Sequence, residues 1–300
     1  MTGQNTPRIS FIGFGEAGQA IASGLRDSGI ERIGAWDILF PLPEGARLRA
    51  AGEKLGVRLA HSAAEAVAET DMVISAVTAA SSLEAARSVE PYLNGNPFYL
   101  DINSVSPGRK QETAKLLDGK ARYVDVAVIA AIHPARHRTP MLLAGPHAEA
   151  ISPLLQELDM RISVVAPQTG AAAAIKMIRS VMIKGIEALT VECFLAAARA
   201  GVLDEVTVSL KNNYPGVDWA KMSEYNLERM ASHGERRAAE MEESAATLRE
   251  LGIDPLMVEA TVARQREMGA AGKHEQVRAT LDQGRAAMLE AISAVAKVRQ

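Results

Sequence analysis

The segment Ile9-Ser10-Phe11-Ile12-Gly13-Phe14-Gly15-Glu16-Ala17-Gly18 decides the fold of this chain. A short apolar run of strand type leads directly into three glycines spaced G-x-G-x-x-G, and a helical pattern follows. The first glycine permits a tight turn, the second lets backbone N–H groups reach a pyrophosphate, and the third lets the helix pack close to the strand. The pattern predicts a dinucleotide-binding loop that consists of Gly13, Phe14, Gly15, Glu16, Ala17 and Gly18.

An acidic residue stands where such a loop requires one. Asp37 follows Gly18 by 19 positions and ends the second apolar run. There a carboxylate can accept hydrogen bonds from both hydroxyls of an adenosine ribose. The phosphate of NADP would bring negative charge against this carboxylate, and no arginine immediately follows it. We therefore expect NAD as the cofactor, with NADP as the alternative.

The composition excludes several classes of protein. The 300 residues are 48% hydrophobic, enough for about two domains, and the net charge of -3 gives no general attraction to nucleic acid. The one cysteine, Cys193, excludes an intrachain disulfide and is expected in the core, and no Cys/His spacing indicates a metal site. No signal-peptide pattern and no membrane-length apolar run is present, so we expect a cytoplasmic protein without a membrane partner.

Two structural patterns divide the chain. Up to about residue 165, short runs rich in Val and Ile alternate with helical patterns, which predicts a parallel sheet covered by helices. Further strands are expected at residues 72–77, 98–102, 123–129, 141–144 and 161–165. Residues 62–65 match a capping box at a helix start.

Only helical patterns follow Gly170. Helices are expected at residues 170–200, 218–251 and 275–298, with another after Asp254-Pro255. The fold class is therefore α/β: a Rossmann-type doubly wound domain at residues 1–167, then an all-α domain at residues 168–300, joined by a long interdomain helix. The long amphipathic faces of the second domain predict that two copies pair as a homodimer.

Lys176 is the candidate catalytic residue. A dehydrogenase needs a group that exchanges the hydroxyl proton while a nicotinamide exchanges hydride, and Lys176 lies near the start of the long helix. Its neighbours along the chain are apolar, so partial desolvation is expected to lower the pKa of this lysine toward working pH. The alternative is a surface lysine on an amphipathic helix.

Taken in order, these features resemble the β-hydroxyacid dehydrogenases, the family of 3-hydroxyisobutyrate, tartronate semialdehyde and 6-phosphogluconate dehydrogenases. The resemblance covers most of the chain and includes residues 12–18, residues 101–107, the strand with Asp125, and residues 170–176. In that family a lysine on the interdomain helix is the catalytic acid/base, within a motif of glycine, any residue, glycine, three residues, lysine, three residues and asparagine. Gly170 and Lys176 match, while Ala172 and Ser180 replace the second glycine and the asparagine. The chain most resembles a divergent phosphogluconate-dehydrogenase-like branch.

The resemblance also implies cofactor and substrate positions. It places Val77, Thr78 and Asn103 at the nicotinamide ribose and ring. The positions that it implies for the substrate are Asn103, Ser104, Ile129, Ala130 and Ala131. Arg179 and Ser180 follow Lys176 by three and four positions, so they lie on its helical face and could meet the substrate or serve only in packing between helices. Residues 129–131 are a departure, because the family usually has a serine and two glycines there to hold the substrate carboxylate.

Two further groups of residues have open roles. Residues 132–140 supply His133, Arg136, His137 and Arg138, which could hold an anionic group or belong to a solvated basic loop. The spacing of the two histidines is poor evidence for a metal. In the helical domain, three further side chains could project into a cleft or serve only in packing: Trp219, Tyr225 and His233.

Together these features predict an NAD(P)-dependent oxidoreductase, with NAD preferred, that interconverts a hydroxy compound and its carbonyl by hydride transfer. The substrate is expected to be a small anionic molecule such as a hydroxy acid, with Lys176 as general acid/base, and decarboxylation after oxidation stays open. An imine reductase is one alternative, although that group usually has aspartate or tyrosine near the lysine position. A nucleotide-binding protein without catalysis is the other.

Overall fold

The computed structural model describes residues 6–296. The chain divides into two compact units, one ending at Lys176 and the other beginning at Met177. The sequence pattern places the boundary between residues 167 and 168, shortly before the long helix expected from residue 170. The structure keeps the first turn of that helix with the sheet, and the roles assigned to the two domains stay predictions.

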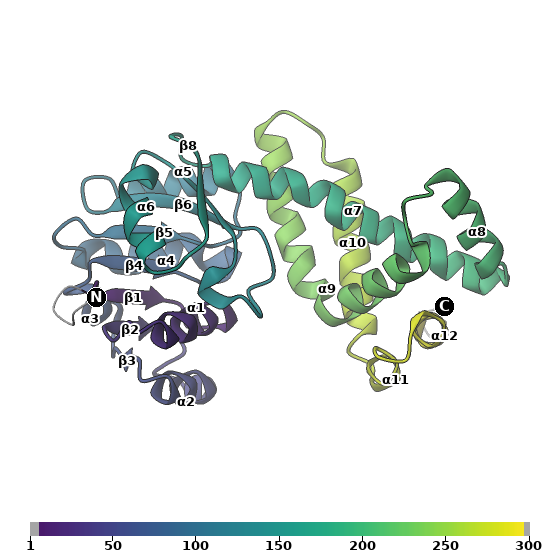
Figure 1. The fold of residues 1–300 in the computed structure, drawn as a ribbon, viewed down its shortest axis with the longest axis horizontal. Helices are drawn as coiled ribbons and strands as arrows, with labels where there is room; N and C mark the ends of the chain where they lie inside the picture. Colours follow the sequence, from purple (N-terminus) through teal and green to yellow (C-terminus); the bar gives the residue numbers. More distant parts are fainter. Residues whose placement is uncertain (1–5, 297–300) are drawn as a thin grey trace. The chain divides into compact units, whose positions relative to one another are not determined.

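The first unit is built on an eight-stranded sheet, in which the strands follow the order β3-β2-β1-β4-β5-β6-β7-β8 (Figure 1). The strands are β1 (Ile9–Ile12), β2 (Ile33–Trp36), β3 (Arg58–Leu59), β4 (Met72–Ser75), β5 (Phe98–Asp101), β6 (Arg122–Val128), β7 (Met141–Ala144) and β8 (Ile162–Ala166). Strands β1 to β6 pair in parallel, so their carboxyl ends share one edge of the sheet. This is the Rossmann-type arrangement that the sequence predicted, and ligands bind at this edge in such folds.

Side chains that alternate along the strands form two separate hydrophobic cores, one on each face of the sheet. Phe11, Ile74 and Leu100 belong to one cluster, which α1 (Glu16–Asp27) and α6 (Ala148–Glu157) also join. Val73 and Tyr99 belong to the opposite cluster, where α3 (Ala63–Val67), α4 (Ser82–Val89) and α5 (Pro107–Leu116) pack. Because successive side chains of a strand point to opposite faces, both faces of the sheet are covered. A further helix, α2 (Ala46–Lys54), follows β2.

One strand departs from the predicted parallel sheet. β7 pairs antiparallel to β6 and parallel to β8. The residues between β6 and β7 contain only a short 3-10 turn, η4 (Arg136–Arg138), and no crossover helix. Without a crossover the chain returns in the opposite direction, as in a hairpin.

The second unit consists of helices. They are the part of α7 (Ala171–Ala200) that follows Lys176, then α8 (Leu203–Asn213), α9 (Trp219–Glu250), α10 (Leu256–Ala271), α11 (Glu275–Arg278) and α12 (Arg285–Ala296). α9 and α10 approach very closely where Gly234 faces Gly269, and a Cβ on Gly234 would lie 2.2 Å from the carbonyl oxygen of Gln265. Among residues 6–296, no helix has both the length and the apolar composition to span a membrane.

Two expectations about this unit are wrong. The last predicted helix, 275–298, is interrupted between α11 and α12, and Gly284 at the end of the interruption adopts a φ of +88°, which a helix cannot continue through. Residues 297 and 298 lie outside the described part of the chain. Cys193, expected in the core, is an exposed residue of α7.

Candidate functional site

The three glycines after β1 differ in their surroundings. Gly13 has a φ of +88°, and a Cβ there would lie 2.4 Å from the carbonyl oxygen of Ala76. A Cβ on Gly18 would lie 2.8 Å from the carbonyl oxygen of Gly13, so α1 crosses the strand end closely. At Gly15, by contrast, no heavy atom of the described chain beyond its immediate neighbours lies within 4 Å of the Cβ position. The loop is therefore packed on both sides and open at its middle glycine.

Asp37 closes this loop from the end of β2. The backbone N–H of Phe14 donates to Oδ2 of Asp37 (2.7 Å), and the N–H of Leu39 donates to Oδ1 (2.9 Å). A carboxylate can accept about four hydrogen bonds, so the half-buried Asp37 keeps capacity for further donors. The Phe14 ring is buried, so this residue offers only its backbone, whereas Glu16 is exposed.

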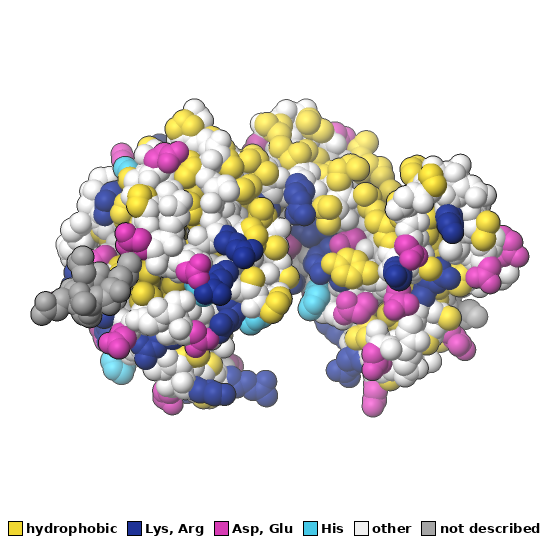
Figure 2. Space-filling view, in the orientation of Figure 1, with side chains coloured by type: hydrophobic (Ala, Val, Ile, Leu, Met, Phe, Trp, Pro, Cys, Tyr) yellow, Lys and Arg dark blue, Asp and Glu magenta, His cyan; other side chains and the backbone are white. Residues whose placement is uncertain are grey.

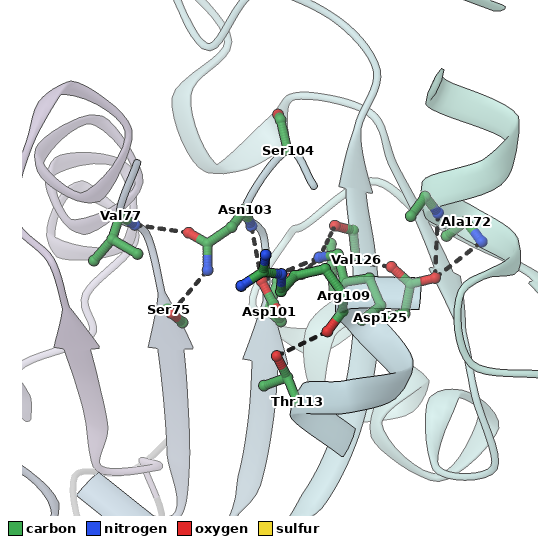
Figure 3. A network of polar contacts seen from close by, with 12 residues as sticks. Ser75, Val77, Asp101, Asn103, Ser104, Arg109, Thr113, Asp125, Val126 and Ala172 are labelled. Carbon is green, nitrogen blue, oxygen red and sulfur yellow. Dashed lines mark hydrogen bonds and ion pairs between the residues drawn. The ribbon is translucent and has the colours of Figure 1, made fainter. Parts of the chain in front are cut away.

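Asn103 connects two loops at the carboxyl edge. Its Oδ1 accepts from the backbone N–H of Val77 (2.7 Å), and its Nδ2 donates to Ser75 Oγ (3.0 Å), as Figure 3 shows. The side chain is buried and faces β4. Thr78 is exposed beyond this contact. The structure thus brings Val77 and Asn103 together, with Asn103 as the clamp between the loops after β4 and β5.

Lys176 is brought to the same edge. Its Nζ donates to Oγ of Ser104 at 2.5 Å, although the two residues are 72 positions apart. Ser104 follows Asn103 directly, and both Ser104 and Lys176 are half-buried. The first unit therefore joins the lysine to the loop that begins at the end of β5.

The basic residues after β6 have structural partners. Arg136 Nη1 donates to Asp27 Oδ2 (2.5 Å) and to Ser23 Oγ (3.1 Å) on α1, while Arg138 forms an ion pair with Asp159. The buried His137 packs against α1, where its ring lies so close to Gly24 that a Cβ there would collide with it. Burial, and then the positive charge of Arg138, lower the pKa of His137.

Of the two alternatives left open by the sequence, these contacts argue against a group of free anion ligands. They fasten the segment after β6 to α1. Ala130 and Ala131 are exposed, Ile129 is half-buried, and His133 is exposed.

The candidate residues of the helical unit differ in exposure. Arg179 is exposed and Ser180 is buried. Trp219 is half-buried and packs edge-on against Tyr214, with ring centroids 5.8 Å apart, so it serves in packing. Tyr225 and His233 are exposed.

The sequence patterns did not predict a buried charged group that lies beneath this edge of the sheet. Lys110 on α5 lies between Asp101 and Asp125, and the side chains of all three are at most 1% exposed. A signal existed: residues 110, 113 and 117 repeat at helical spacing, and Thr113 and Leu117 are buried. A lysine on the buried side of a helix indicates a buried anion, and no sequence period identifies its partner.

The geometry defines a class of protein, a Rossmann domain with a dinucleotide loop and a lysine at one sheet edge, followed by an all-helical unit. Residues 8–103 match the family model described as NADP oxidoreductase coenzyme F420-dependent, and residues 197–268 match a domain of unknown function, DUF1932. A conserved protein of Sinorhizobium meliloti 1021 is similar in structure, with 35% identity, 97% of each chain covered and a TM-score of 0.79.

Two other solved structures are similar. MTH1747, a conserved protein described as structurally similar to 3-hydroxyacid dehydrogenases, has 30% identity over 88% of this chain and 97% of its own, with a TM-score of 0.70. The 3-hydroxyisobutyrate dehydrogenase of Mycobacterium tuberculosis has 16% identity over 97% and 99% of the chains, also with a TM-score of 0.70, and shows the shared fold. This chain belongs to the β-hydroxyacid dehydrogenase superfamily, as its sequence motifs indicated. The general class is an NAD(P)-dependent oxidoreductase.

Proposed function

We propose that this protein is an NAD-preferring dehydrogenase that interconverts a hydroxy acid and its carbonyl compound, with Lys176 as general acid/base. The observation that carries the proposal is the hydrogen bond from Lys176 Nζ to Ser104 Oγ (2.5 Å). It supports a functional lysine at the carboxyl edge, where the glycine loop and Asp37 also lie, and argues against a lysine that only faces solvent.

The residues around the loop fit a dinucleotide. No heavy atom of the described chain beyond the immediate neighbours lies within 4 Å of a Cβ at Gly15, and α1 begins at the next residue, where the first backbone N–H groups of a helix have no partner within it. Asp37 keeps acceptor capacity for ribose hydroxyls, and its negative charge disfavours a ribose phosphate. We therefore propose Gly13 to Gly18 for the pyrophosphate, Asp37 for the ribose, and Val77, Thr78 and Asn103 near the nicotinamide.

When bound, the nicotinamide supplies the site that accepts or gives hydride. Lys176 then has one task, which is to take the proton of the substrate hydroxyl in oxidation and return it in reduction. Ser104 accepts a hydrogen bond from Lys176 Nζ and so orients this group at the carboxyl edge of the sheet.

We propose that the substrate lies beside Asn103, Ser104 and the segment Ile129 to Ala131, of which the two alanines are exposed. Because Ile129 stands where the family has serine, backbone groups would replace the missing serine hydroxyl. Arg179 and Ser180 follow Lys176 by one helical turn on α7, and the guanidinium of Arg179 suits an anionic group.

The first experiment is titration of the protein with NADH and NADPH, followed by nicotinamide fluorescence, with Asp37→Ala beside the wild type. We expect NADH to bind more tightly than NADPH, and Asp37→Ala to weaken NADH by about tenfold or more and reduce this preference, since a ribose contact to a charged group is lost. Absence of binding by either nucleotide would refute the proposal.

The second experiment tests catalysis on a panel of hydroxy acids with NAD. We expect Lys176→Met to abolish NADH production while it retains nucleotide binding, and Lys211→Met, an exposed lysine of α8, to behave as wild type. Full turnover in Lys176→Met would refute the role of Lys176 as general acid/base. Nucleotide binding without turnover on hydroxy acids, alcohols or imines would support the non-catalytic alternative.

We also propose that the helical unit pairs with a second copy. The exposed side chains of Ile178, Met182 and Leu189, with exposed fractions of 47%, 65% and 59%, recur on one face of α7, and Cys193 continues the row. Figure 2 shows hydrophobic side chains gathered on the surface of the helical unit. Exposed apolar rows of this length favour burial against a partner.

A further inference from the structure

Three buried charges lie beneath the edge that carries Ser104 and Lys176. Asp101 ends β5, and Asp125 stands directly opposite it in the register of β6. Lys110 reaches them from α5, with Nζ 3.0 Å from Asp101 Oδ1 and 3.6 Å from Asp125 Oδ1. The same Nζ donates to the backbone carbonyl of Asp101 (2.6 Å). Two facing carboxylates would repel one another in this dry setting, so Lys110 is what allows both to lie there.

Asp125 binds the beginning of α7. Its Oδ2 accepts the backbone N–H groups of Gly170 (3.1 Å), Ala172 (3.0 Å) and Ala173 (3.2 Å). Figure 3 shows this carboxylate directed at the first helical turn. These N–H groups have no partner within the helix, and a negative charge at a helix N-terminus is favourable. Asp125 is thus the cap of α7, supplied from a strand 45 residues earlier.

Lys110 favours the charged form of this cap. Burial raises the pKa of Asp125, and the Lys110 ammonium is the first of the groups that oppose this change. The N–H groups of Ala173 and Gly170 act in the same direction as Lys110, whereas the negative charge of Asp101 raises the pKa further. Removal of Lys110 would therefore weaken the cap without touching it.

Asp101 fixes the loop after β5, which carries Ser104, the partner of Lys176. Its Oδ1 accepts the backbone N–H of Asn103 (3.0 Å), and its Oδ2 accepts the hydroxyl of Tyr123 (2.8 Å). Asn103 immediately precedes Ser104. The buried charges therefore hold both ends of the Ser104–Lys176 contact, one through the loop after β5 and the other through the first turn of α7.

We propose that Lys110 and Asp125 are positioning residues, which hold the first turn of α7 on the sheet and so keep Lys176 Nζ at Ser104. This inference rests on the proposed function of Lys176. Lys176 follows Ala172 and Ala173 by about one turn, so movement of that turn moves the lysine. A displacement of 1 Å in a catalytic group can slow a reaction by about 100-fold.

Hydrogen exchange tests the structural part without a substrate. We expect Asp125→Asn and Lys110→Met to speed amide exchange in residues 170–176 by about tenfold or more, because charge-assisted hydrogen bonds are lost there. The matched control is Lys184→Met, which also removes a buried lysine from an ion pair, with Glu240 (2.7 Å), but within the helical unit. We expect it to leave residues 170–176 unchanged. Unchanged exchange in Asp125→Asn would overturn the proposal.

The pH dependence of lysine labelling tests the consequence for Lys176. Acetic anhydride modifies only neutral amines, so the extent of labelling against pH, measured by peptide mass spectrometry, follows the titration of each lysine. We expect the midpoint of Lys176 labelling to change in Lys110→Met and Asp125→Asn, but not in Lys184→Met. An unchanged Lys176 midpoint in both variants would show that Lys110 and Asp125 act on stability alone, and would overturn the proposal.

Turnover then separates this inference from the proposed function. We expect kcat to fall by about 100-fold in Asp125→Asn, while NADH affinity stays within about twofold, because the glycine loop makes no contact with Asp125. If Lys176→Met keeps full turnover, the proposed function fails even where exchange and labelling respond. If only Lys176→Met loses turnover and Asp125→Asn does not, the positioning role fails and the proposed function stands. Should Lys110→Met not fold, the nearly isosteric Asp125→Asn provides all three measurements.

Discussion

Substitution of Gly15 by alanine should weaken cofactor binding and leave the fold intact. Gly15 has φ −72° and ψ −161°, which alanine adopts without strain, and no heavy atom of the described chain beyond its neighbours lies within 4 Å of the new Cβ. Replacing glycine by alanine stabilises the folded protein by about 0.4–1 kcal/mol, because the unfolded chain has fewer conformations to lose. Alanine is also a poorer residue at the helix N-cap, which offsets a similar amount. The melting temperature should therefore stay within about 2 °C of wild type.

The effect on binding should be large. The methyl group would fill the space proposed for the pyrophosphate and displace one charge-assisted hydrogen bond, worth about 1.5–3 kcal/mol, or about 10- to 150-fold in Kd. Fluorescence titration with NADH measures this change. Gly185→Ala on α7, also with open surroundings, is the matched control and should bind NADH normally. Gly18→Ala should destabilise the domain, because its Cβ would lie 2.8 Å from a carbonyl oxygen. Wild-type NADH affinity in Gly15→Ala would refute the assignment of the loop.

Three further predictions concern other parts of the molecule. Gly234→Ala should destabilise the helical unit by about 3 kcal/mol or more, because its Cβ would lie 2.2 Å from the Gln265 carbonyl oxygen; an unchanged urea midpoint would show that the α9–α10 contact is looser. Since burial lowers the pKa of His137 below its ordinary 6.5, the unfolded chain takes up this proton first as the pH falls. Stability should therefore drop on acidification below about pH 6.5, more steeply in wild type than in His137→Gln, and parallel melting curves from pH 7.5 to 5 would contradict this. Met182→Arg should convert the proposed dimer to a monomer in light scattering, and a wild-type mass for the variant would exclude this face of α7.

Local patterns were sufficient for much of the fold. The strand, the glycine loop and the helix after it lie within residues 9–27, and the alternating runs that follow identify the doubly wound sheet. Local patterns were insufficient for the helix predicted at residues 275–298, because a single glycine, Gly284, is a weak signal for a break within an otherwise helical stretch. The direction of β7 was missed because it depends on how a connection returns, and periodicity does not report this.

The sequence by itself determined the Rossmann fold, because the glycine spacing and the alternating runs lie along the chain, and its resemblance to a known family indicated the superfamily and Lys176 as the candidate lysine. Only the tertiary structure decided that Lys176 meets Ser104, that Asp125 caps α7, and that Lys110 lies between two carboxylates. It also assigned the basic residues after β6 to contacts with α1 and Asp159. The physical reason is that periodicity records which side of an element is buried, whereas the partner of a buried charge depends on the packing of segments that lie far apart in the chain.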